Sequence, residues 1–94
     1  MTPVETGILA EHAAQSALLV LAMKIIVQAA FPKEEHNEVL RNLELIGCNS
    51  VQSMPITGVP PDALPALREH AMMRVTDLVS AVAEILRNDD GQRA

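Results

Sequence analysis

The chain has 94 residues, of which 49% are hydrophobic, and its formal net charge is −5 at pH 7. This length predicts a single domain, 1–94, whose stability as a monomer has a thin margin. Nucleic acids and anionic membranes attract proteins through Lys and Arg, so an acidic chain argues against both as partners.

The first predicted helix covers about residues 3–30 and has an apolar centre. Residues 17–23 carry no polar side chain, and seven residues make about two turns, so this part must be surrounded on all sides. Polar side chains lie on one side early in the helix, and Lys24 and Gln28 lie roughly opposite. We therefore expect the two halves of this helix to face solvent on opposite sides and to pack against two different neighbours.

Two further helices are predicted after this one. Pro32 ends the first helix and can open a second at about 32–46, with Gly47 as its C-terminal stop. Asp62 is a suitable N-cap for a third helix at about 62–88, which has a continuous apolar stripe. Residues 89–94 are expected to form a disordered tail.

The order of these elements predicts an all-α fold, a three-helix up-down-up bundle. The second helix would be about 21 Å long and the others about 35–40 Å, so it cannot cover them fully. A second copy of the chain would complete the cover, which predicts a helical homodimer built around the first helix. The expected interface residues are Leu18, Leu19, Leu21, Ile25 and Ile26.

The predicted loop, 47–61, is long for a compact domain and contains apolar residues. Met54, Ile56 and Val59 are candidates for contact with a ligand or partner. We expect Met54 and Ile56 to be at least half buried against the first and third helices. An alternative function follows from this loop: a small enzyme or carrier with an apolar ligand pocket beneath it.

The sequence favours no catalytic, metal or cofactor site. Each of the three histidines follows a Glu, but adjacent residues on a helix do not share a face, as metal ligands must. His36 continues the apolar stripe of the second helix and is expected at the edge of the core. Cys48 follows a helix C-terminus without a cationic neighbour, which does not favour a reactive thiolate.

Location and function complete these predictions. A single cysteine suits a reducing compartment, and the N-terminus has no Lys or Arg of the kind that opens a signal peptide. Lys24 within the first helix would cost about 2.5–3.5 kcal/mol in a bilayer, which argues against a membrane span. We expect a small cytoplasmic homo-oligomer that acts by binding, as a regulatory or accessory module with a possible protein partner, rather than by catalysis.

Overall fold

The computed structural model describes the backbone of residues 1–93 and the side chains of residues 1–89. Its elements are helix α1 (Pro3–Ala30), a short 3-10 turn η1 (Lys33–Glu35), helix α2 (His36–Ser53) and helix α3 (Leu64–Arg93). The prediction of an all-α chain with three packed helices is confirmed.

Helix α1 begins and ends where the sequence predicts. The Thr2 hydroxyl accepts a hydrogen bond from the backbone N–H of Glu5 at 3.1 Å, and Pro3 occupies the first helical turn. Phe31 is extended, with φ −133° and ψ 142°, as expected for a residue that precedes proline. The helix therefore has defined signals at both ends.

Helix α2 is longer than predicted, because Gly47 does not end it. A Cβ atom at Gly47 would lie 2.9 Å from Cγ1 of Val75, so this glycine permits close packing of α2 against α3. The helix continues to Ser53, where Arg68 of α3 donates hydrogen bonds to the backbone carbonyls of Gln52 and, at 3.1 Å, Met54. Capping by a residue from α3 has no local signal in the sequence.

Helix α3 begins two residues later and ends later than predicted. The backbone N–H of Leu67 donates to the Ala63 carbonyl at 3.1 Å, so the first helical hydrogen bond starts at Ala63 rather than Asp62. The helix continues through Asp89 to Arg93, in the segment where the sequence predicts a disordered tail. Ala94 lies outside the described residues. Asp89 contacts α1, and this tertiary contact favours the extra helical turn.

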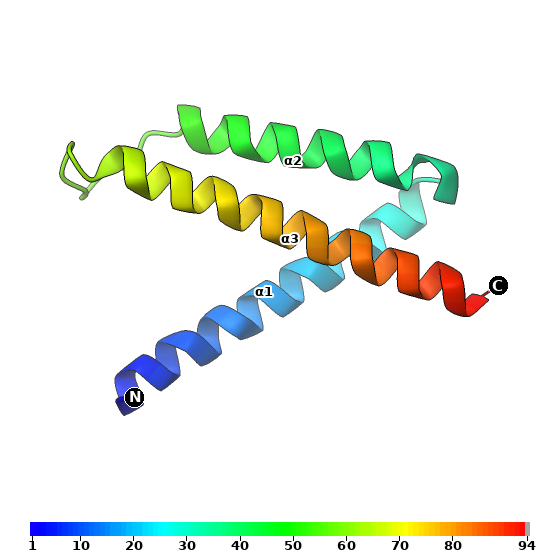
Figure 1. The fold of residues 1–94 in the computed structure, drawn as a ribbon, viewed down its shortest axis with the longest axis horizontal. Helices are drawn as coiled ribbons and strands as arrows, with labels where there is room; N and C mark the ends of the chain where they lie inside the picture. The colour runs from blue at the N-terminus through cyan, green and yellow to red at the C-terminus, as the bar shows by residue number, and fades with distance from the viewer. Residues whose placement is uncertain (94) are drawn as a thin grey trace.

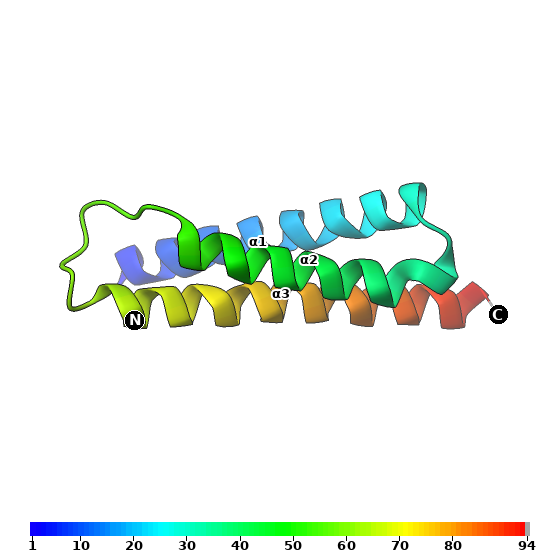
Figure 2. The same cartoon turned by 90° about the horizontal axis from the view of Figure 1, so that it is seen from above.

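The three helices do not lie parallel as in a regular bundle. Helices α2 and α3 run side by side, whereas α1 crosses α3 obliquely and its N-terminal half diverges from both (Figure 1). Seen from above, the C-terminal half of α1 lies in a separate layer from α3 (Figure 2). The principal extents are 49 × 34 × 16 Å, so the molecule is thin.

The buried core is small and lies where α1 crosses α3. Val82 is fully buried, at 0% exposure. Partly buried side chains such as Met23 and Val75 pack around this centre. The fully apolar core consists of Val20, Val27, Leu40, Val79, Val82 and Leu86. A core of this size leaves most large apolar side chains of α1 exposed.

Candidate functional site

Large apolar side chains of α1 form an exposed surface, which we call the outward face. Leu18 is 68% exposed, Ile25 62% and Ile26 61%. Leu19 and Leu21, the other two residues predicted at a dimer interface, are also exposed. Only Val20 and Val27 of this helix are buried, because it packs mainly against α3 and contacts α2 less extensively. All five residues of the predicted dimer interface are therefore exposed in the single chain.

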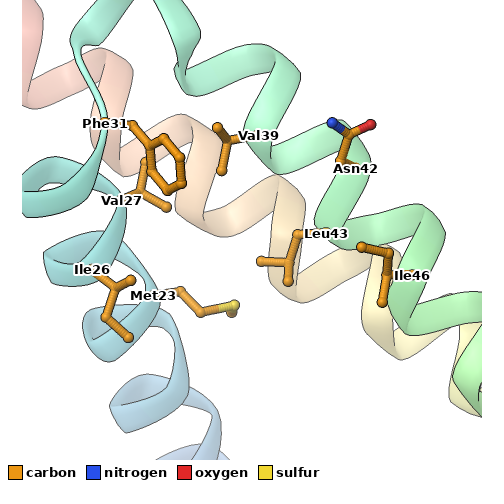
Figure 3. Close-up of a pocket in the computed structure, with 8 residues that line it drawn as sticks. All are labelled: Met23, Ile26, Val27, Phe31, Val39, Asn42, Leu43 and Ile46. Atoms are coloured by element: carbon orange, nitrogen blue, oxygen red, sulfur yellow. The ribbon is translucent and has the colours of Figure 1, made fainter.

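An apolar groove lies beside this face, between α1 and α2. Its volume is about 450 Å³. Ile26 belongs both to the outward face and to the groove, so the two surfaces are continuous (Figure 3). Among the described lining residues, Asn42 alone is polar. The groove is lined by Met23, Ile26, Val27, Phe31, Val39, Asn42, Leu43 and Ile46.

The groove continues toward α3 as a smaller depression of about 200 Å³. Met23 and Leu43 line both hollows, and Gly47 and Val75 lie where α2 approaches α3. The groove arises because α1 diverges from α2 beyond the connection at Pro32 (Figure 1). Helices that diverge from a short connection leave an open apolar angle between them.

Polar contacts hold α1 against α3 at both ends of the crossing. The Nζ atom of Lys24 lies 2.6 Å from Oδ2 of Asp89, and Gln28 donates to the same oxygen at 3.3 Å. Earlier in α1, the Ser16 hydroxyl accepts a hydrogen bond from Arg74. The prediction that Lys24 and Gln28 mark a solvated side is wrong: both are partly buried, because α3 extends far enough to supply Asp89.

Residues 1–15 project from the rest of the molecule and are helical from Pro3 onward (Figure 1). All of them are exposed, including the apolar Val4 and Ile8. The hydrogen bonds shown for their side chains are local, such as that from Gln15 to Glu11 at 3.4 Å. We call residues 3–15 the N-terminal arm.

The predicted loop residues do not line the groove between α1 and α2. Met54 is 53% exposed, so the expectation that it is at least half buried is wrong by a narrow margin. It follows α2 directly, and its carbonyl rather than its side chain is held by Arg68. Ile56 and Val59 are partly buried. The groove described above lies between α1 and α2, not beneath residues 47–61.

The three histidines differ in burial. His36 is 8% exposed at the start of α2, as its place in the apolar stripe predicts. Its Nε2–H donates to the Phe31 carbonyl at 3.0 Å and so ties α2 to the end of α1. His12 and His70 are exposed. Within the described part of the chain, no three His, Cys, Asp or Glu side chains come close enough together to hold a metal ion.

Cys48 lies within α2, not beyond its end. It is partly buried, and its thiol lies 3.8 Å from the Met72 carbonyl, to which it can donate a weak hydrogen bond. This contact is one of packing between α2 and α3.

Comparison with known protein families, curated proteins and solved structures finds no match for this chain. By length and composition alone, α1 could also cross a membrane. Only 11% of its most apolar 18-residue stretch is buried, unlike the core helix of a soluble protein. The rest of the chain therefore leaves most of the apolar surface of α1 uncovered.

Proposed function

We propose that the protein is a homodimeric helical binding module in which two copies associate through the outward face of α1. The single observation that carries this proposal is the exposure of five large aliphatic side chains on one helix. Burying each of them would contribute about 1.5–3 kcal/mol before the costs of association. A symmetric partner would bury the same residues on both copies.

One chain exposes more surface than a compact monomer of its mass, which supports an interface of substantial size. The accessible area is 6945 Å² for a mass of 10.1 kDa, whereas a compact folded monomer of this mass exposes about 5,300 Å². The excess is about 1,600 Å², roughly twice the 800 Å² that each partner buries in an interface of standard size. The radius of gyration of 15.9 Å also exceeds the roughly 12 Å expected for a compact chain of this length.

Protein is a better occupant than lipid because of the polar groups on α1. The helix carries Lys24 near its apolar centre, in an ion pair with Asp89 of a second, amphipathic helix. A bilayer would require both charges to leave water. Association of two copies leaves this ion pair at the edge of the molecule. We also propose that the dimer is cytoplasmic and acts as a regulatory or accessory protein.

The proposal is tested by the mass in solution and by one matched pair of variants. Sedimentation at micromolar concentration is expected to give twice the chain mass for the native protein. Leu18→Glu should shift the mass toward that of one chain or cause aggregation, because it places a charge in the interface. Leu45→Glu is the control, since Leu45 is 60% exposed but lies on α2.

Three results would contradict this function. The first is a stable native monomer at micromolar concentration. The second is an equal effect of the Leu18 and Leu45 substitutions on the mass. The third is flotation of the native protein with phosphatidylcholine vesicles, which would assign the outward face to lipid.

A further inference from the structure

We infer that the groove between α1 and α2 is the docking site for the N-terminal arm of the second copy. This inference rests on the proposed dimer and specifies how its two chains interlock. The N-terminal arm of each copy would pack into the groove of the other copy. Val4 and Ile8 would make the apolar contacts.

The arm needs such a site for its own stability. Residues 3–15 would extend about 20 Å as a helix, and all of them are exposed. Isolated helices of about 12–15 residues are marginal in water, because tertiary packing supplies most helix stability in proteins. Val4 and Ile8 are 71% and 62% exposed and lie one turn apart on the same side of the arm.

The apolar lining of the groove suits an apolar helix such as the N-terminal arm. Its walls are aliphatic and aromatic, and Phe31, Leu43 and Ile46 remain accessible at its rim (Figure 3). It is open to solvent rather than enclosed. Apolar grooves of this kind bind helices that present aliphatic residues one turn apart. We therefore expect a helix, rather than a single small molecule, to occupy this open groove.

Symmetry connects the two surfaces. If two α1 helices pair in antiparallel directions about an axis near Leu18, a residue ten positions before the axis lies opposite one about ten positions after it. Ile8 then lies near residue 28 of the partner, beside the groove that Ile26 and Phe31 line. Parallel pairing would bring the two arms together and leave both grooves empty, so antiparallel pairing buries more apolar area.

Disulfide trapping tests this arrangement. In a Cys48→Ser background, which retains a hydrogen-bond donor at that site, Ile8→Cys is combined with Leu43→Cys in the groove. The matched control combines Ile8→Cys with Leu45→Cys on the same helix. We expect covalent dimers on a non-reducing gel to form about ten times faster in the first protein, because disulfides require Cα atoms within about 7 Å.

A second variant tests the arm without new cysteines. Ile8 is exposed in one chain, so Ile8→Glu should leave the helical content of the chain nearly unchanged and raise the dimer dissociation constant at least tenfold. A native monomer would refute both this inference and the proposed function. A native dimer with equal trapping at Leu43 and Leu45, or with an unchanged dissociation constant for Ile8→Glu, would refute the inference alone. A small apolar molecule retained in the groove of the native dimer would also refute it.

Discussion

Replacing Gly47 with alanine tests the closest approach between α2 and α3. In the structure, a Cβ atom at this position would lie 2.9 Å from Cγ1 of Val75, well inside the 3.5–4.0 Å of a favourable carbon–carbon contact. Val75 is β-branched and adjusts poorly within a helix. The added methyl group must therefore displace Val75 or separate the two helices.

Two opposing contributions determine the magnitude. Glycine in a helix interior is less favourable than alanine by about 0.5–1 kcal/mol, which would stabilise the variant. Overpacking of a close contact costs about 1–3 kcal/mol. We expect Gly47→Ala to lower the free energy of unfolding by up to about 2 kcal/mol. Gly7→Ala meets nothing within 4 Å, and the substitution should be neutral or stabilising.

Thermal unfolding followed by circular dichroism, at one fixed protein concentration, measures this effect. For a chain of this size, 1 kcal/mol corresponds to about 4–8 °C in Tm. The decisive comparison is a double-mutant cycle with Val75→Ala, which removes the obstructing methyl groups. In that background Gly47→Ala should be markedly less harmful. A zero coupling energy between Gly47→Ala and Val75→Ala would refute the packing role of Gly47.

Two further predictions concern contacts made by α3. Arg68→Ala should speed amide hydrogen exchange over residues 50–54 and cost about 1–2 kcal/mol, since the C-terminal carbonyls of α2 lose their donor; unchanged exchange in this segment would contradict the capping role. Lys24→Ala should lower Tm more at low salt than at high salt, because its ion pair with Asp89 is partly exposed; an equal loss of Tm at both salt concentrations would argue that Lys24 acts only through packing.

The ends of α1 and the character of its surface were predictable from local chemistry. Thr2 and Pro3 specify the start, and Phe31-Pro32 specifies the end, because both signals act within one turn of the chain. The run of residues 17–23 without polar side chains predicts a helix that one neighbour cannot cover, and the structure leaves Leu18 and Leu21 exposed.

The ends of α2 and α3 could not be predicted, because contacts distant in sequence decide them. Gly47 resembles a helix stop when only its neighbours are considered, but its lack of a side chain serves the contact with Val75. The capping of α2 by Arg68 bridges more than a dozen residues of sequence. The same reasoning explains why Lys24 was assigned to solvent, since its partner Asp89 lies in a segment expected to be disordered.

The sequence by itself therefore determined the helical class, the limits of α1 and the apolar character of its surface, since these depend on local capping and on residue composition. The tertiary structure alone decided that α1 crosses α3 obliquely and that an apolar groove forms between α1 and α2. Crossing angles depend on which side chains interdigitate between helices. Periodicity identifies the apolar face of each helix but not the direction from which its neighbour approaches.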